Sequence, residues 1–389
     1  MGFIVGKIYI YTNAISRKNG GSSSILDLAN CMSDLGFDVE IRTVLGKMDR
    51  YIYQTSNVNK NLNIKCINNE VVSSSHKGKL KKVINKFLSF PYKIDVPQKA
   101  VVIDSYGIPL DYKNKLQDNG CKVVLNHAGS VKAYANYFMT TKSESDKLEE
   151  YKRYIQTYDF VLFQSQSQAN ELDSIIGRKI SLLIRPSVSD KDIVNCLNYP
   201  KNVLDKKKLN ITVVGSVQKR KGQDVLIEIA QLLDSYNTEY VINVIGNVLE
   251  YDFYENLIND IRNKKLEGKI VFYGFKKDYL NYMNDSDIIL QVSKEEGVSR
   301  ILREAMALGK PIVSFKLDGT ADLLEDGIDS LLVNPGDIKG ISLKLQLLLN
   351  DKFMRDTLGI KAKQNFDKKY SYKIYSEQVR DFLISLRKS

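Results

Sequence analysis

A segment that alternates apolar runs with one amphipathic stretch, residues 288–315, constrains the fold of this chain most. The apolar run 288–292 predicts a short buried strand, and the run 311–315 predicts a second one. Between them, Ser299 is expected to cap a helix of regular apolar spacing that ends at Gly309. This pattern is typical of a parallel α/β sheet, in which a helix start that follows a strand end binds anions through its free N–H groups and its dipole.

Two acidic residues frame the predicted helix start. Glu296 lies in the loop and Glu304 lies eight residues later, a separation of about 12 Å if every step is helical. A carboxylate accepts hydrogen bonds from vicinal hydroxyls, which a sugar or a ribose offers. Taken alone, the pair is more simply explained as surface acids near a helix start, where acids are common.

The residues around the pair favour a more specific interpretation. They resemble the Glu-x7-Glu signature of retaining glycosyltransferases of family 4, which have the GT-B fold. The resemblance extends through Glu-Ala-Met-Ala-x-Gly-x-Pro-Ile-Val (304–313), Asp-Gly-Thr-Ala-Asp-Leu-Leu (318–324) and Leu-Leu-Val-x-Pro-Gly-Asp (331–337). It implies that Glu296 contacts the donor sugar and that Glu304 contacts the nucleotide ribose. Further donor-site residues implied by the resemblance are Gly297, Val298 (in place of the family's usual aromatic residue), Ser299 and Arg300.

A glycine-rich loop follows the first predicted strand, residues 7–11. The loop, residues 19–24, contains Gly20 and Gly21 and precedes a predicted helix and a second strand at 37–41. This order predicts the opening of a doubly wound sheet, although a plain turn with a helix cap explains the glycines equally well. The loop lacks the G-x-G-x-x-G pattern, which argues against a nicotinamide cofactor. It resembles the family's Gly-Gly loop, which faces the donor phosphates and the acceptor.

His127 stands at the carboxyl end of a predicted strand, residues 122–126. Ligands of open α/β sheets bind at such strand ends, but a lone histidine is more often a satisfied polar residue. Its position resembles that of the family's strand-end histidine, which lies near the donor sugar. The resemblance therefore implies that His127 positions the sugar.

The loop 216–222 has the sequence SVQKRKG and joins a predicted strand at 210–215 to a helix. A basic run of this kind is usually a solvated loop, but its place between a strand end and a helix start suits an anion. The resemblance implies that Lys221 contacts the donor pyrophosphate and stabilises the leaving group. Ser216 replaces an arginine of the family pattern, and Arg220 is expected to compensate.

The resemblance covers nearly the whole chain and implies two Rossmann-like doubly wound domains that face each other across a cleft. The expected division is an acceptor-side domain at 1–186, a linker at 187–208, a nucleotide-sugar domain at 209–370, and a terminal helix at 371–389 that crosses back to the first domain.

Composition excludes several classes of site. Four scattered cysteines and two histidines provide no metal-binding spacing, and they fit a reducing cytoplasm. The triplets 190–192 and 285–287 look like Asp-x-Asp metal motifs, but such triplets arise easily by chance, so we expect no metal and no other cofactor. The net charge of +11 predicts anionic partners, and without a zinc-finger or RNP signature we expect no nucleic acid. The sequence shows neither a secretory signal nor an apolar run of the roughly 18 residues that span a membrane.

Residues 76–90, HKGKLKKVINKFLSF, form a basic amphipathic pattern. Apolar residues recur at helical spacing, and five lysines occupy the remaining positions without an intervening acid. Such a helix binds an anionic membrane surface, or it packs its apolar face in a domain core with its lysines in water. We expect peripheral membrane binding, because many enzymes of the resembled family glycosylate lipid-linked acceptors.

The family resemblance implies a retaining glycosyltransferase that moves a sugar from a nucleotide-sugar donor, with a UDP-sugar expected, to a saccharide, a lipid-linked acceptor or a cell-surface polymer; the positive net charge makes an anionic polymer one of the expected acceptors. Two alternatives stay open from the sequence. One is a non-catalytic GT-B partner subunit, and the other is a GT-B nucleotide-sugar epimerase or phosphorylase.

Overall fold

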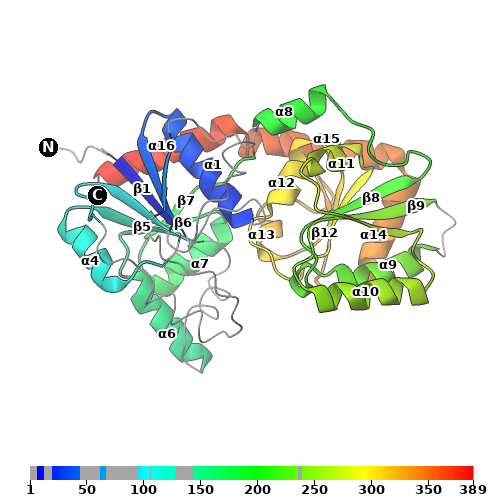
Figure 1. Ribbon diagram of the computed structural model, residues 1–389, viewed down its shortest axis with the longest axis horizontal. Coiled ribbons are helices and arrows are strands. Elements are labelled where there is room, and N and C mark those ends of the chain that lie inside the picture. The colour runs from blue at the N-terminus through cyan, green and yellow to red at the C-terminus, as the bar shows by residue number, and fades with distance from the viewer. Residues whose placement is uncertain are drawn as a thin grey trace. The chain divides into compact units, whose positions relative to one another are not determined.

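The computed structural model describes residues 7–12, 20–43, 62–66, 95–105, 107–127, 143–188, 190–234 and 239–388. Its contacts divide the chain into two units, each built around its own parallel sheet (Figure 1). The first unit comprises Met1–Pro186 and Lys373–Ser389, and the second comprises Ser187–Tyr372.

The first unit contains a seven-stranded sheet in the order β3-β2-β1-β4-β5-β6-β7, with every pair parallel. Because the order reverses between β1 and β4, this is a doubly wound sheet with a switch point at that pair. The strands are β1 (Lys7–Thr12), β2 (Asp38–Thr43), β3 (Asn63–Cys66), β4 (Val101–Asp104), β5 (Lys122–Asn126), β6 (Phe160–Phe163) and β7 (Ser181–Leu183). The helices are α1 (Gly20–Asp34), α4 (Leu110–Asp118), α6 (Glu144–Ile155), α7 (Gln166–Ile176) and α16 (Tyr372–Lys388).

The predicted glycine loop before α1 is shorter than expected. The sequence predicted a flexible loop over 19–24, whereas the helix begins at Gly20, so that Gly20 and Gly21 lie in its first turn. Glycine disfavours helix, but buried residues further along α1, such as Ala29 and Met32, anchor it. Packing of an apolar face contributes more to a helix than the propensity of its first residues.

The second unit contains a six-stranded parallel sheet in the order β10-β9-β8-β11-β12-β13, which reverses between β8 and β11. The strands are β8 (Leu209–Val214), β9 (Tyr240–Ile245), β10 (Ile270–Gly274), β11 (Ile288–Gln291), β12 (Ile312–Phe315) and β13 (Leu331–Val333). The helices are α8 (Asp190–Asn198), α9 (Leu226–Leu233), α10 (Tyr251–Asn263), α11 (Tyr279–Asp285), α12 (Arg300–Ala307), α13 (Asp318–Ala321), α14 (Ile338–Asn350) and α15 (Lys352–Lys369). Two short 3-10 turns, η1 (Lys219–Lys221) and η2 (Gln223–Val225), precede α9.

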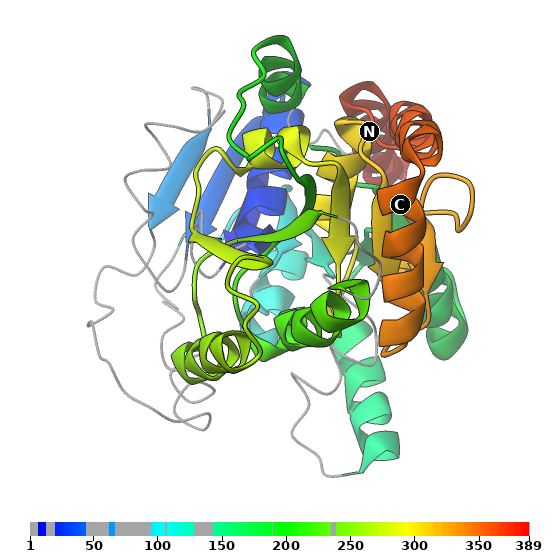
Figure 2. The same ribbon diagram turned by 90° about the vertical axis from the view of Figure 1, so that its right-hand side faces the viewer.

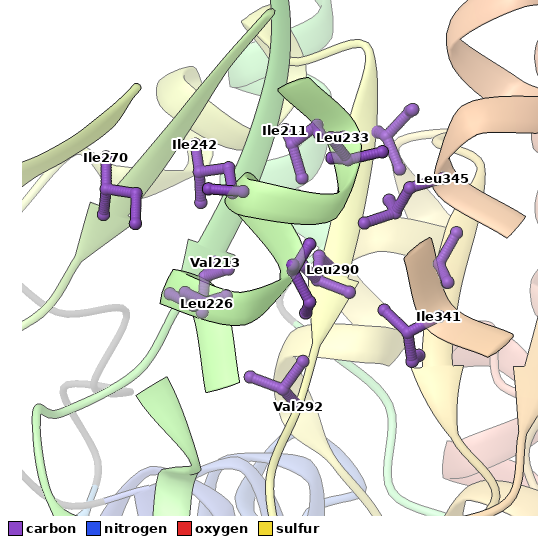
Figure 3. Close-up of a cluster of buried hydrophobic side chains, with 14 of the residues drawn as sticks. Ile211, Val213, Leu226, Leu233, Ile242, Ile270, Leu290, Val292, Ile341 and Leu345 are labelled. Atoms are coloured by element: carbon purple, nitrogen blue, oxygen red, sulfur yellow. The ribbon is translucent and has the colours of Figure 1, made fainter. Parts of the chain in front are cut away.

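Two apolar layers cover this second sheet. Ile288 and Leu290 of β11 belong to a buried cluster with α9, α10 and α14, in which Figure 3 labels Leu290. Ile289 belongs to a second cluster with α8, α11, α12 and α15. Figures 1 and 2 both show α9 and α10, in green, on the side of the sheet opposite α11 and α12, in yellow. Burial on both faces explains why these strands are continuous apolar runs in the sequence.

The segment predicted as a linker packs on the second unit. It contains α8, whose Ile193 and Cys196 are buried in the cluster with α11 and α12. The carboxylate of Asp285 accepts hydrogen bonds from the backbone N–H groups of Val203 and Leu204, at 2.7 and 2.8 Å. The second Asp-x-Asp triplet therefore anchors the backbone, and Asp287 likewise accepts from the N–H of Asn210.

Within the described part of the chain, no helix is both long enough and apolar enough to cross a bilayer. Residues 76–90, for which the sequence predicts a basic amphipathic helix, lie outside the described residues.

A buried polar cluster lies between β4, α4 and α6 of the first unit. Lys113 is 1% exposed; its Nζ donates to Thr157 Oγ1 at 2.6 Å and lies 3.8 Å from the centroid of the Tyr158 ring. Tyr158 donates to the fully buried carboxylate of Asp104 at 2.6 Å. Burial lowers the pKa of Lys113 from 10.5 to about 8, although the negative charge of Asp104 opposes this shift.

The depressed pKa of Lys113 predicts a pH-dependent stability. Between about pH 8 and pH 10.5 the folded protein binds fewer protons at this site than the unfolded chain, so the free energy of unfolding rises with pH. The rise is at most about 3.5 kcal/mol, since the shift is about 2.5 pKa units and one unit corresponds to about 1.4 kcal/mol. Lys113→Met should abolish this contribution, as measured by urea unfolding at pH 7.5 and pH 10. Lys115→Met controls for the loss of a positive charge, because Lys115 is an exposed lysine of the same helix. If the free energy of unfolding changed equally between the two pH values in the parent protein and in Lys113→Met, the prediction would be wrong.

Candidate functional site

The predicted helix between β11 and β12 is present as α12 and is correctly capped. Ser299 is its N-cap, and the Ser299 hydroxyl accepts a hydrogen bond from the N–H of Leu302 at 3.4 Å. Leu302, Ala305 and Met306 form its buried face, and Gly309 follows its end with a φ of +66°. The helix therefore directs its N-terminus toward the loop that contains Glu296.

Glu296 is the centre of a polar cluster at the carboxyl end of β11. Its Oε1 atom accepts from Gln291 Nε2 at 3.1 Å and from Ser293 Oγ at 2.8 Å. The ammonium group of Lys221 forms an ion pair with the same oxygen. Arg220 places a guanidinium nitrogen 3.8 Å from Oε2. Two cations that are 75 and 76 residues distant in sequence thus converge on one carboxylate.

A glycine allows the basic loop to approach β11. Gly222 has a φ of +71°, and a Cβ atom there would lie 2.1 Å from the carbonyl oxygen of Val292. Next to this contact, the N–H of Lys294 donates to the carbonyl of Arg220 at 2.9 Å, and the guanidinium of Arg220 donates to the carbonyl of Glu295 at 2.8 Å. These contacts join the β8–α9 loop to the β11–α12 loop and place Lys221 against Glu296.

Ser216 organises the basic loop from within. Its hydroxyl accepts from Gln218 Nε2 at 2.7 Å, and its carbonyl accepts from Gln223 Nε2 at 3.0 Å. Arg220, which was expected to replace the missing arginine at position 216, does lie beside Glu296.

Glu304 has a different environment from Glu296. It is only 2% exposed, which argues against a plain surface acid. Its Oε1 accepts from the hydroxyl of Tyr279 at 2.7 Å and from Arg300 Nε at 2.8 Å, whereas its buried Oε2 has no hydrogen-bond partner. Burial and the negative charge of Glu304 raise the pKa of Tyr279 well above its usual value, so this hydroxyl stays protonated and acts as a donor. The second carboxylate oxygen of Glu304 is thus an unused acceptor.

The Glu-Gly-Val segment packs against α13. A Cβ atom at Gly319 would lie 2.1 Å from the carbonyl oxygen of Gly297, so the two backbones touch directly. Val298 is half-buried beside the apolar cluster of α12. The loop before α12 is therefore held on one side by the basic loop and on the other by α13.

Three of the predicted site residues belong to the first unit. Gly20 and Gly21 lie in the first turn of α1. His127 follows β5 and is 1% exposed; its Nε2 lies 2.8 Å from the hydroxyl of Tyr151, and its ring lies 4.6 Å from the ring of Phe163. The ring is thus packed and hydrogen-bonded within the first unit, and its role toward a sugar stays a prediction.

Sequence analysis missed three residues of the cluster. Gln291 had a visible signal, because it is an amide inside an otherwise apolar strand run. Ser293 lies within the segment 288–315, but the sequence pattern assigned it no role. Tyr279 had no local signal, since it contacts Glu304 from α11, 25 residues earlier.

The arrangement provides two cationic side chains, a helix N-terminus and two carboxylates in one region of the second unit. Cations and free backbone N–H groups favour a phosphate, and a carboxylate with an unused oxygen favours a hydroxyl donor. In the described part of the chain, no three His, Cys, Asp or Glu residues are grouped so that they could hold a metal ion.

Comparison with known proteins agrees with this arrangement. Residues 198–365 match the family model of the Glycosyl transferases group 1. The capsular polysaccharide biosynthesis glycosyltransferase CapM of Staphylococcus aureus is 26% identical over 171 residues, which cover 43% of this chain and 44% of CapM. The poly(ribitol-phosphate) alpha-N-acetylglucosaminyltransferase of S. aureus is 25% identical over 215 residues, 52% of this chain and 42% of that protein. The chain thus spans less than half the length of these curated relatives.

Solved structures confirm the predicted GT-B fold. Anabaena HepE in complex with UDP and glucose has a TM-score of 0.72 at 18% identity and covers 98% of this chain and 100% of its own. A mutant of S. aureus TarM in complex with Fondaparinux, alpha-GlcNAc-glycerol and UDP has a TM-score of 0.75 at 12% identity, with 97% and 99% covered. At these identities the likeness establishes the fold, two Rossmann-like α/β units, and the matched family supports a group 1 glycosyltransferase for the second unit.

The close approach at Gly222 predicts a destabilising substitution. Gly222→Ala carries two costs. The new Cβ atom would clash with the carbonyl oxygen of Val292, and alanine would have to adopt a positive φ. Gly327→Ala is the matched control, because Gly327 has a φ of +76° with open space around its Cβ position. The positive φ alone costs about 1–2 kcal/mol, so Gly222→Ala should lower the free energy of unfolding by clearly more than Gly327→Ala. Urea unfolding measures both, and equal losses would show that the approach to β11 tolerates a methyl group.

Proposed function

We propose that this protein is a retaining glycosyltransferase that transfers a sugar from a UDP-sugar to an acceptor in cell-surface polysaccharide biosynthesis. The observation that supports it best is the Lys221–Glu296 ion pair beside the N-terminus of α12, with the buried Glu304 within that helix. The group 1 family match over the same residues and the UDP in HepE and TarM support a UDP-sugar as the donor.

In the proposed complex, each half of the site binds a different part of the donor. Lys221, Arg220 and the N–H groups at the start of α12 bind the diphosphate. The unused Oε2 of Glu304 accepts a hydrogen bond from a ribose hydroxyl, while Tyr279 and Arg300 hold its other oxygen. Glu296 accepts a hydrogen bond from a hydroxyl of the transferred sugar. From the family resemblance we also propose that His127 positions the sugar and that Gly20 and Gly21 face the donor phosphates.

Catalysis in this proposal is electrostatic. As the bond between the sugar and the diphosphate breaks, negative charge grows on the leaving phosphate. Lys221 and Arg220 stabilise that charge from positions already fixed by the loop contacts, which is the usual largest contribution of a preorganised site. The side chains of the cluster perform this task without a metal ion. A hydroxyl of the acceptor then attacks the anomeric carbon from the face that the diphosphate leaves and gives its proton to the departing phosphate oxygen, so that the configuration at that carbon is retained.

The charge distribution supports an anionic acceptor. Residues 1–186 and 373–389 contain 30 lysines and arginines against 19 acidic residues, whereas residues 187–372 contain 27 of each. The whole net charge of +11 therefore belongs to the first unit. Such a field attracts anionic polymers, and one relative is named for a poly(ribitol-phosphate) substrate.

The roles of the two carboxylates are tested with UDP and UDP-sugars. Glu304→Gln should weaken the binding of UDP, whereas Glu296→Gln should leave UDP binding intact and slow turnover of the UDP-sugar. Lys221→Ala should lower the rate by about 10- to 150-fold, since a hydrogen bond to a charged group contributes roughly 1.5–3 kcal/mol. Calorimetry gives the affinities, and UDP release from UDP-glucose or UDP-N-acetylglucosamine gives the rates, both in the presence of EDTA.

Three results would contradict this proposal. UDP binding that is unchanged in Glu304→Gln would remove Glu304 from the ribose. A rate within twofold of the parent in folded Lys221→Ala would remove Lys221 from the site. Activity that EDTA abolishes and manganese restores would overturn the metal-free mechanism.

We further propose that the protein acts at the cytoplasmic face of an anionic membrane through residues 76–90. The proposal rests on the sequence alone. The five lysines of this segment favour binding, because each lysine near an anionic surface contributes about 1 kcal/mol. Changing Lys79, Lys81 and Lys82 to Glu should weaken salt-sensitive binding to phosphatidylserine-containing liposomes in a flotation assay. Equal binding of the variant, or no binding of the parent at low salt, would instead assign the segment to a domain core.

A further inference from the structure

Three donors converge on a single oxygen of Glu296. Lys221 Nζ, Gln291 Nε2 and Ser293 Oγ all lie within hydrogen-bond distance of Oε1. A carboxylate has about four lone-pair sites over two oxygens, so one oxygen accommodates roughly two donors. One of the three donors is therefore in excess and can leave without depriving Oε1 of its partners.

The three donors differ in how firmly they are held. Gln291 belongs to β11 and is 8% exposed, and Ser293 directly follows that strand and is 4% exposed. Lys221 instead reaches Glu296 on a long flexible stem from a surface loop, and its side chain is 18% exposed. The lysine is thus the donor that can turn to a new anion, while the amide and the hydroxyl stay in place.

We propose that Gln291, assisted by Ser293, is a positioning residue that holds Glu296 toward the sugar when Lys221 turns to the donor diphosphate. This inference rests on the proposed function, because it concerns the same site. Without these two buried donors, Glu296 would lose its orientation at the moment when its ion pair with Lys221 is broken.

A second contact of Gln291 fits this role. Its Nε2 also lies 3.2 Å from the hydroxyl of Ser299, the N-cap of α12. One amide therefore connects the carboxylate that faces the sugar with the helix start that faces the phosphate. Displacement of either one is opposed by the other through Gln291.

The energetics of the strand argue that Gln291 is present for function. Its Oε1 is buried without a hydrogen-bond partner, which is unfavourable in an otherwise apolar strand. An unbranched apolar residue of similar length removes that unsatisfied oxygen. Gln291→Met is therefore expected to fold with a melting temperature equal to or above that of the parent, while the Glu296 carboxylate loses a donor.

The test compares affinities for UDP and for UDP-sugars, with UDP-glucose and UDP-N-acetylglucosamine as probes in calorimetry. Gln291→Met should bind UDP as the parent does, because the groups proposed to bind UDP are Lys221, Arg220, Glu304 and the backbone N–H groups at the start of α12. Its preference for a UDP-sugar over UDP, and its rate of UDP release, should fall about tenfold, the lower end for a hydrogen bond to a charged group. The same substitution made in Glu296→Gln should have no further effect on the preference, because Gln291 acts through Glu296.

Asn243→Leu is the matched control. Asn243 is a buried amide of β9 in the same unit, and it donates to Asn210 within the sheet. Its replacement removes an equivalent amide away from Glu296 and should change the preference for UDP-sugars by less than twofold. The inference would be overturned by either of two results, each of which would show a general structural effect. One is a loss of preference for UDP-sugars in Asn243→Leu that equals the loss in Gln291→Met. The other is a loss from Gln291→Met that is as large in the Glu296→Gln protein as in the parent. If the parent protein binds UDP and Gln291→Met keeps the parent's preference for UDP-sugars and rate, only the inference about Gln291 is overturned. If the parent protein binds no UDP, both the proposed function and this inference are overturned.

Discussion

The ion pair between Lys221 and Glu296 depends on two loops that meet at the carboxyl ends of β8 and β11. Both side chains are largely shielded from water, so the free energy of each charge depends on the groups within hydrogen-bond distance. Gly222 lets the basic loop touch the backbone directly after β11, and this approach brings Lys221 next to Glu296. The parallel neighbours β8 and β11, at the switch point of the sheet, therefore determine which residues share the site.

The two carboxylates of the signature illustrate how environment separates the roles of identical groups. The Oε1 atom of Glu296 has three donors, of which Lys221 is a cation, and the guanidinium of Arg220 lies 3.8 Å from Oε2. Glu304 is buried in α12 with one oxygen satisfied and the other unused. The first carboxylate can exchange partners during a reaction, whereas the second can only add one. This difference agrees with the proposed roles, in which Glu296 changes partners as the sugar is transferred and Glu304 binds the nucleotide.

Sequence analysis predicted the features that depend on local pattern. Buried runs such as 122–126 and the capped helix after Ser299 were identified from apolar spacing and cap residues, because these signals lie within a few positions. Contacts between distant segments were not predictable in this way. Tyr279 contacts Glu304 from another helix. The polar stretch before β8 contains α8, which the sequence did not predict because its apolar residues are buried only by contact with α11 and α12. Gln291 was visible as an odd residue in a strand, but its partners are defined only by the fold.

The separation of charge between the units agrees with two different kinds of recognition. The second unit has no net charge, so its affinity for a phosphate has to come from a few cations at short range, such as Lys221 and Arg220. The first unit holds the entire excess of +11, which acts over about a Debye length, ~10 Å in 0.1 M salt, and needs no fixed geometry. In the proposed reaction the donor is a small molecule whose phosphate must be positioned to within hydrogen-bond distance. The proposed acceptor is an extended anion, which a long-range field can attract before its reacting hydroxyl is positioned. A neutral unit with local cations suits the first task, and a basic unit suits the second.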